Sequence, residues 1–98
     1  MNDDKDAIAL HGDDHVATVL RPINEGDVVN VSSPNGMVQI IATEAIPIFH
    51  KIALRPLRND SDILKHGDSI GTSISDIEAG AHVHVHNLRS KRALRRSR

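Results

Sequence analysis

A turn unit that recurs along the chain constrains its fold more than any other feature. Residues 20–26 and 54–60 both read Leu-Arg-Pro, then an aliphatic residue, then a polar turn, and a shorter copy covers residues 77–83. The turn position of the three copies is held by Gly26, Asp60 and Gly80. Glycine and aspartate tolerate a positive φ better than most residues. The repeat therefore predicts units of strand, tight turn and strand.

Short β-rich runs fill most of the remaining chain. Pro22 and Pro56 each end a run and enter a turn, and Ser33-Pro-Asn-Gly36 is a strong turn signal. Only residues 43–46 and 74–79 suit a short helical turn. The sequence predicts an all-β fold of short, twisted strands with at most one or two helical turns. The predicted strands are Val16–Leu20, Asp27–Val31, Met37–Ala42, His50–Leu54, Ile63–Lys65, Ile70–Ser73 and Ala81–Asn87.

The composition limits both the core and the chemistry. The chain has 98 residues, enough for one domain, and Phe49 is its one aromatic residue, so the core must consist of Val, Ile, Leu and Ala. A small aliphatic core without disulfides gives modest stability, which favours a homo-oligomer or a partner chain. The absence of cysteine excludes disulfides, cysteine-ligated zinc, iron–sulfur clusters and a thiolate nucleophile.

Charge is distributed unevenly. Residues 89–98 hold six of the twelve Lys and Arg residues, whereas residues 1–88 hold six basic and thirteen acidic residues, a net charge of −7. The acidic body and the lack of aromatic stacking residues argue against nucleic acid as a partner. The chain has neither a signal peptide nor an apolar run of membrane-spanning length, so we expect a cytoplasmic protein without membrane contact.

The run Gly80-Ala-His-Val-His-Val-His-Asn-Leu88 carries the clearest chemical signal. On a β-strand, alternation would place His82, His84 and His86 on one face, with Asn87 following. Such a row suits metal ligation, proton transfer or anion recognition. Histidines on the exposed face of an edge strand are the alternative interpretation.

Strand geometry limits what this run does alone. Cβ atoms of residues two apart on a strand lie about 6–7 Å from each other, so two imidazoles converge on one metal, whereas a third lies ~13 Å from the first. A complete site therefore needs His50, His66, a carboxylate or another chain. Zinc, iron(II), manganese and nickel all accept imidazole, so the spacing does not name the metal.

His50 and Lys51 are the next candidates. A histidine beside a cation has a lowered pKa and suits a base, while the alternative is a solvated Lys51 and a His50 that caps a turn. His66, His11 and His15 lie in polar turns or loops. The chain contains no phosphate-binding glycine loop, no G-x-S-x-G and no H-E-x-x-H motif.

Taken in order, these motifs resemble the N-terminal SAF domain of the UxaA-type sugar-acid dehydratases, the altronate dehydratase family. The resemblance covers roughly residues 8–88, and its most specific part is the closing His-Val-His-Val-His-Asn. The matching stretches are Asp14-His-Val-Ala17, Leu20 to Val28, Ile46-Pro-Ile-Phe-His-Lys-Ile-Ala-Leu54, Lys65-His-Gly67, Ile70-Gly71 and Asp76 to Asn87.

The resemblance implies a β-clip fold over residues 7–88, between a flexible N-terminus at 1–6 and a basic tail at 89–98. It also implies a subunit of a lyase that is inactive alone. A separate large catalytic subunit would complete the site, as with the alpha subunit of sulfolactate sulfo-lyase, and a sugar acid would be the substrate. A divalent metal, commonly iron(II), would be shared with or held by that subunit. His50 and Lys51 would be catalytic, and His82, His84, His86 and Asn87 would contact metal or substrate.

The sequence departs from the family pattern at three positions. Phe49 and Asp60 stand where relatives have a turn glycine, and His66 replaces a tyrosine. Three functions stay open. The first is the small subunit of a sugar-acid dehydratase or of sulfolactate sulfo-lyase. The second is a non-catalytic module that binds sugar acids, and the third is a metal-binding regulator or storage protein.

Overall fold

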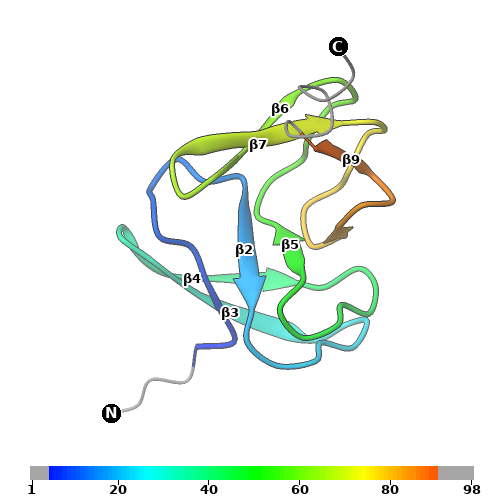
Figure 1. Ribbon diagram of the computed structural model, residues 1–98. Coiled ribbons are helices and arrows are strands. Elements are labelled where there is room, and N and C mark those ends of the chain that lie inside the picture. Colours follow the sequence, from blue (N-terminus) through cyan, green and yellow to red (C-terminus); the bar gives the residue numbers. More distant parts are fainter. Residues whose placement is uncertain (1–4, 91–98) are drawn as a thin grey trace.

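Strands β2 (Val16–Val19) and β5 (Lys51–Ala53) form the centre of the fold, which a computed structural model describes for residues 5–90. They run antiparallel, with Ala17 opposite Ile52. Five of their seven side chains are buried, which suits the small and β-branched residues found there. Figure 1 shows that one end of β2 lies close to β6 and β7, which belong to a second sheet.

The larger sheet has six strands in the order β4-β3-β1-β2-β5-β8. Strand β1 pairs in parallel with β3 and antiparallel with β2, so the sheet is mixed. Strands β4 and β8 are its two edges in the order of pairing, and the end of β4 at Ile41 lies against Gly80, two residues before β8. The remaining strands of this sheet are β1 (Ala7–Ile8), β3 (Val28–Ser33), β4 (Gly36–Ile41) and β8 (His82–Val83).

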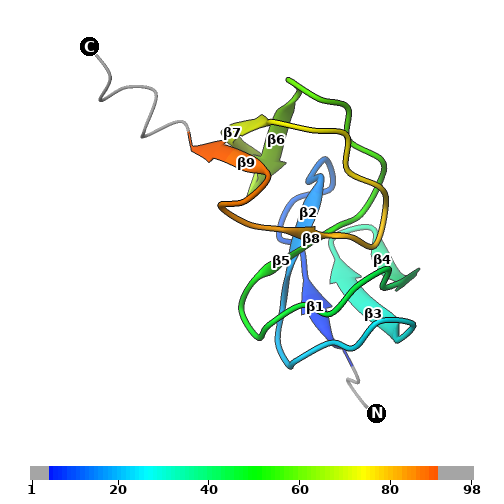
Figure 2. The same ribbon diagram turned by 90° about the vertical axis from the view of Figure 1, so that its right-hand side faces the viewer.

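The smaller sheet packs across the end of β2 that begins at Val16, as Figure 2 shows from the side. It contains β6 (Asp62–Lys65), β7 (Asp68–Ser73) and β9 (Leu88–Ser90), with β7 in the middle. A Cβ atom on Gly71 would lie 2.1 Å from the Arg89 carbonyl oxygen. Only glycine therefore allows β9 to approach β7 this closely.

The core divides into two aliphatic clusters that meet at β2 and β5. One cluster lies under the six-stranded sheet and includes Val19, Ile23 and Ile52, while the other lies toward the smaller sheet and includes Val16 and Ile63. Neighbouring residues of one strand serve different clusters because successive side chains point to opposite faces.

The turn unit occurs four times in the described chain, once more than the sequence repeat indicates. Each copy places an aliphatic residue in an isolated β-bridge, and the bridges join Ile23 to Ile46 and Leu57 to Ile77. The residue three positions later has a positive φ in every copy. These residues are Gly26 (89°), Phe49 (71°), Asp60 (66°) and Gly80 (90°). The predicted units at Gly26, Asp60 and Gly80 are confirmed. The copy at residues 43–50 was not predicted, because Phe49 stands at the turn position that glycine or aspartate holds in the other copies.

The prediction of an all-β fold with at most one or two helical turns is confirmed, and one predicted strand is corrected. Residues 5–90 contain no helix, because the segments 43–46 and 74–79 form the bridges just described. The predicted strand Ala81–Asn87 ends at Val83, and a turn follows. No helix in the described residues has the length and apolarity needed to span a membrane.

The ends of the ordered domain reach beyond residues 7–88. Asp6, which we expected in the flexible N-terminus, accepts hydrogen bonds from Arg21 Nε and the Asn30 backbone N–H, both at 2.8 Å. Strand β9 extends into the region expected to be tail. Most of the basic tail, residues 91–98, and residues 1–4 lie outside the described part of the chain.

Candidate functional site

His50 is fixed by the turn that precedes β5. Its backbone N–H donates to the Pro47 carbonyl (3.1 Å), and its own carbonyl accepts the Val19 N–H (2.9 Å). The antiparallel pairing of β5 with β8 places Ile52 opposite His82. This register brings the imidazole before β5 next to the imidazoles of the β8 segment.

The histidine run leaves the sheet after Val83, and Asn87 shapes the turn that follows. The buried Asn87 side chain donates to the His82 carbonyl at 2.8 Å and accepts the His84 N–H at 3.0 Å. Its backbone N–H donates to the His84 carbonyl at 3.1 Å. Asn87 thus holds the histidine loop, and its amide is occupied by backbone partners.

The three histidines His50, His82 and His84 form one half-buried cluster. Their rings stack, with the centroids of His50 and His84 3.8 Å apart and those of His50 and His82 5.0 Å apart. Nδ1 of His50 lies 2.8 Å from Nε2 of His82. One ring nitrogen from each residue lies within 4.8 Å of the others, a separation at which three ligands reach a single metal ion.

His86 lies at the margin of this cluster. It is exposed, and its ring centroid is 4.8 Å from that of His82 at a tilt of 40°. The separation of ~13 Å expected along a straight strand does not apply here, because the chain turns at His84. The structure therefore brings all four candidate histidines onto one patch.

The surroundings of His82 and His84 lower the pKa of both imidazoles. Burial lowers the pKa of His82, and the neighbouring imidazoles His86 and His50 lower it further, although Glu44 acts in the opposite direction. Burial followed by the charge of His50 lowers the pKa of His84. A neutral imidazole has the free lone pair that metal ligation requires.

One ring nitrogen of the cluster, Nδ1 of His84, is buried without a hydrogen-bond partner among the described residues. A buried polar nitrogen without a partner costs about 1–3 kcal/mol, so such atoms are rare unless a ligand or water satisfies them. The three imidazoles and this unpaired nitrogen fit a divalent metal, which His50, His82 and His84 would hold.

Lys51 adds a cation beside the cluster. Its ammonium group is half-buried, and burial together with the nearby charge of Lys65 lowers its pKa. Its charge in turn contributes to the lowered pKa of His84, so the two side chains share one electrostatic neighbourhood. A lysine in this setting has a larger neutral fraction, which a proton-abstracting group needs.

The other histidines have structural environments. Nδ1 of His15 accepts the Leu64 backbone N–H at 3.0 Å, and the His66 and Gly67 backbone N–H groups donate to the Asp14 carboxylate at 2.8 Å each. The convergent group of the described residues contains His50, His82 and His84 but not His66, although the sequence allowed it.

Glu44 lies beside the site, although it was not among the candidates predicted from the sequence. Its Oε2 accepts the His82 backbone N–H at 3.1 Å. No motif indicates this contact, because Glu44 reaches His82 only through the bend of residues 43–50.

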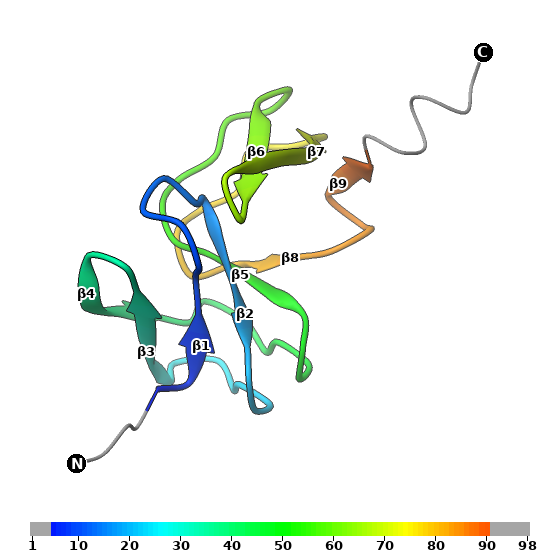
Figure 3. The same cartoon turned by 60° about the vertical axis from the view of Figure 1, so that its left-hand side comes forward.

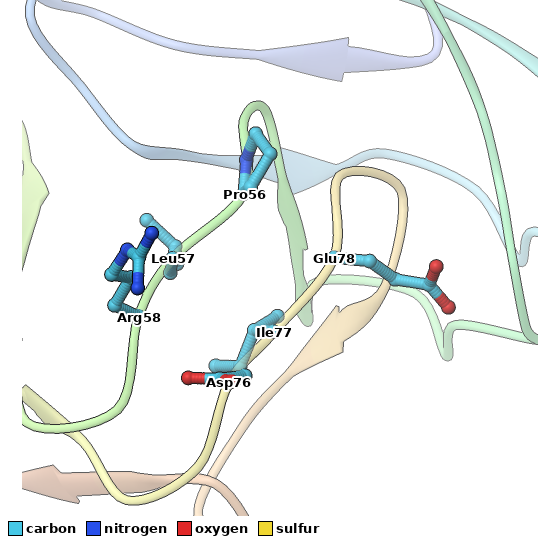
Figure 4. A pocket seen from close by; sticks show the side chains of 6 residues that line it. All are labelled: Pro56, Leu57, Arg58, Asp76, Ile77 and Glu78. Atoms are coloured by element: carbon cyan, nitrogen blue, oxygen red, sulfur yellow. The ribbon is translucent and has the colours of Figure 1, made fainter.

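One cavity lies away from the histidine cluster. It measures about 490 Å³ and surrounds the bridge between Leu57 and Ile77. Figure 4 shows Arg58 and Glu78 pointing in different directions there, so its charged groups do not converge. Its lining residues are Pro56, Leu57, Arg58, Asp76, Ile77 and Glu78. The histidine cluster lies outside this cavity and remains the site with convergent chemical groups.

A family comparison identifies the kind of domain that carries this cluster. The family model of the altronate/galactarate dehydratase SAF domain matches residues 5–91. The chain belongs to this SAF-domain family.

Named relatives of this SAF domain fall into two groups. It is 34% identical over 90 residues to the (2R)-sulfolactate sulfo-lyase subunit alpha of Chromohalobacter salexigens, covering 89% of this chain and 96% of that protein. It is 40% identical over 62 residues to the same subunit of Paracoccus pantotrophus, covering 63% and 92%. It is 35% identical over 86 residues to the altronate dehydratase of Bacillus subtilis, covering 88% of this chain but 16% of that protein.

The three departures from the family pattern share one structural property. Phe49, Asp60 and His66 are the non-glycine residues with a positive φ in residues 5–90, at 71°, 66° and 55°. At two of them the SAF domain keeps a left-handed turn that glycine would form without strain. Phe49 directly precedes His50, so this turn sets the entry of the chain into the histidine cluster.

Proposed function

We propose that this SAF domain is the small subunit of a carbon–oxygen lyase, a sugar-acid dehydratase, and that a separate large subunit completes its active site. The observation that supports this proposal most directly is the half-buried cluster of three convergent imidazoles in a chain of this family. The cluster offers ligands and a neighbouring lysine but no enclosed substrate cavity. The chain alone is therefore inactive in this proposal.

The proposed reaction is the elimination of water from a polyhydroxy acid. The C–H bond next to the carboxylate breaks and its proton goes to a base. The C–O bond at the neighbouring carbon then breaks, and the departing hydroxide takes up a proton from an acidic group and leaves as water. A divalent metal, iron(II) by analogy with the family, would lower the energy of the negative charge that develops on the carboxylate. His50, His82 and His84 would hold this metal, and its open positions would receive the substrate.

The chain's own residues have distinct roles in this proposal. Lys51 acts as the base, or holds the substrate carboxylate when protonated, because its pKa is lowered and it lies beside His84. His86 is exposed at the margin and contacts the substrate or the large subunit. Asn87 fixes the loop that carries His82 and His84.

The named relatives support a two-subunit organisation. Sulfo-lyase subunits alpha match this chain over nearly their whole length, and their name implies a further subunit. In altronate dehydratase the matching region is 16% of a much longer protein. We infer that the longer protein carries in one chain what the present domain shares with a partner.

A carbon–sulfur lyase is the second candidate. Here the leaving group is sulfite, and the proton next to the carboxylate is removed in the same way. The favourable observation is the 96% coverage of a sulfolactate sulfo-lyase subunit. The histidine cluster fits both reactions, because both begin beside a carboxylate.

The test is reconstitution of this chain with the large subunit of a two-subunit lyase of this family. Water elimination from altronate and galactarate is measured in parallel with sulfite release from (2R)-sulfolactate, with iron(II) present. We expect activity only in the mixture, and the substrate that turns over decides between the two reactions. Full activity of the large subunit without this chain would contradict the proposal.

The site assignment is tested in the same mixture with variants. We expect His84→Ala and His82→Ala to lower kcat/KM roughly 100-fold or more, because each removes a proposed ligand. His66→Asn is the matched control, since His66 is exposed and asparagine tolerates its positive φ. Unchanged activity of a variant lacking both His84 and His86 would overturn the assignment.

A further inference from the structure

Strand β4 is an edge strand without the usual protection. It forms one edge of the six-stranded sheet and pairs with β3 through six regular residue pairs. Five of its six residues are exposed, and it contains neither a charged residue nor a proline. Exposed apolar edges of this kind readily accept another strand.

The other sheet edges of the described chain differ from β4. Strand β6 carries Asp62 and Lys65 and has a register shift between Ile63 and Leu64, and β9 carries Arg89. Strand β8 is only two residues long. Charges, bulges and short length are the common ways in which proteins block edge pairing. Of these four edge strands, β4 alone has none of the three features.

The surroundings of β4 are also free of charge. Residues 28–43 form an uncharged stretch of sixteen residues in a chain with 26% charged residues. Val28, Met37, Val38 and Ile41 expose 46%, 53%, 45% and 58% of their surface. A second copy approaching this hairpin would meet apolar side chains and no like charge.

The backbone register shows which groups of β4 face outward. The Ala42 N–H donates to the Asp27 carbonyl at 2.9 Å, so Ala42 turns its backbone groups toward β3. In an antiparallel ladder the direction alternates, and therefore Met37 and Gln39 turn their N–H and carbonyl groups away from β3. The free stretch ends at Ile41, because its carbonyl oxygen lies against Gly80.

We propose that two copies of this chain associate through their β4 strands, antiparallel about a two-fold axis at Val38. Val38 then faces Val38 of the second copy, and Met37 faces Gln39. The outward backbone groups of Met37 and Gln39 exchange about four hydrogen bonds across the axis. An axis at Gln39 is disfavoured, since it brings the second copy against Gly80.

This dimer is compatible with the histidine site. Strands β4 and β8 are opposite edges of the same sheet, as Figure 3 shows. The proposed hydrogen bonds involve only Met37 and Gln39. They end before Ile41, where β4 reaches Gly80, so they leave His82 and its neighbours accessible to another subunit. The proposal goes beyond the lyase function and does not depend on it.

A cysteine scan provides the sharpest test, because the natural chain has no cysteine. Residues that face each other as a non-hydrogen-bonded antiparallel pair have Cβ atoms about 4.5–5.5 Å apart, which is close to what a disulfide needs. We expect mild oxidation to convert V38C to a covalent dimer. I41C is the matched control, because Ile41 is at least as exposed as Val38 but its two copies lie roughly 20 Å apart across the axis.

Sedimentation equilibrium of the intact chain is the second measurement. We expect a monomer–dimer equilibrium that Q39P shifts strongly toward monomer. This proline removes an outward N–H and leaves the ladder to β3 intact, and circular dichroism checks that the fold is retained. A natural chain that stays monomeric up to millimolar concentration overturns the proposal. Equal cross-linking of V38C and I41C, or unchanged self-association of Q39P, also overturns it.

Discussion

At Phe49, one residue combines backbone strain with an unusual exposure. Its φ is 71°, and 67% of its surface is exposed. A bulky residue in the left-handed region costs about 1–2 kcal/mol, and an exposed side chain recovers little of this by packing. Such strain is often found beside functional groups, and here the strained residue precedes His50.

Phe49→Gly should therefore stabilise the domain. We expect the free energy of unfolding to rise by about 0.5–1 kcal/mol, since glycine removes the strain but gains some freedom in the unfolded chain. Urea denaturation measures the change. Gly26→Ala is the mirror control, because a methyl group there meets no atom within 4 Å and only the φ of 89° opposes it. A destabilised Phe49→Gly protein would show that Phe49 packs usefully.

The Asp14 carboxylate links two loops through hydrogen bonds, and their contribution to stability depends on pH. Burial alone would raise the pKa of its carboxyl, but the N–H groups of Gly67 and His66 outweigh burial and hold the pKa below its usual value. Because the folded pKa is lower than the unfolded one, the ion contributes stability above the unfolded pKa. That contribution is lost as the pH falls below about 4 and through the folded pKa.

We expect Asp14→Asn to lower the free energy of unfolding by about 1–3 kcal/mol at pH 7, because an amide oxygen replaces a carboxylate that accepts two N–H groups. The variant should also lose stability less steeply than the natural chain between pH 5 and pH 3, a window of about two units around the ordinary pKa. Chemical denaturation at several pH values measures both effects. Identical acid profiles would exclude this role, and the exposed Asp13→Asn serves as control.

At the scale of elements, a turn determines where the imidazoles of the histidine run lie. A straight strand through residue 87 would separate His82 and His86, whereas β8 ends at Val83 and the loop folds back. Asn87 closes this loop through side-chain bonds to His82 and His84. The position of the imidazoles therefore depends on one buried amide.

Asn87 variants separate its two bonds. Asn87→Ala loses both, so we expect fast amide hydrogen exchange at His84 and a loss of about 1–3 kcal/mol in stability. Asn87→Asp keeps the oxygen that accepts the His84 N–H and should retain slow exchange there. Exchange measured by NMR distinguishes the variants, and equal protection of His84 in both would mean that the loop holds without Asn87.

For the whole molecule, β2 and β5 couple the two core clusters. Val16 and Ala53 pack on one side of these strands, and Ala17 and Ile52 pack on the other. If β2 and β5 separate, side chains of both clusters become exposed. This sharing predicts one cooperative unfolding transition.

Truncation in either cluster should weaken the same transition. We expect Ile46→Ala and Ile63→Ala, both fully buried, each to cost about 2–5 kcal/mol and to leave a single transition. Far-UV circular dichroism and NMR amide signals from both sheets should give coincident curves. Separate melting of the smaller sheet in Ile63→Ala would show that the clusters are independent.

The sequence alone determined the strand content and the turns at Gly26, Asp60 and Gly80, and it singled out the histidines that the structure brings close together. These features are local, because alternation, turn residues and positive φ act over a few neighbours. The tertiary structure decided the rest. It turned the chain at His84, joined His50 to His82 through the β5–β8 register, and moved His66 to a structural role beside Asp14. Contacts between residues more than thirty positions apart depend on sheet order, which local patterns do not encode.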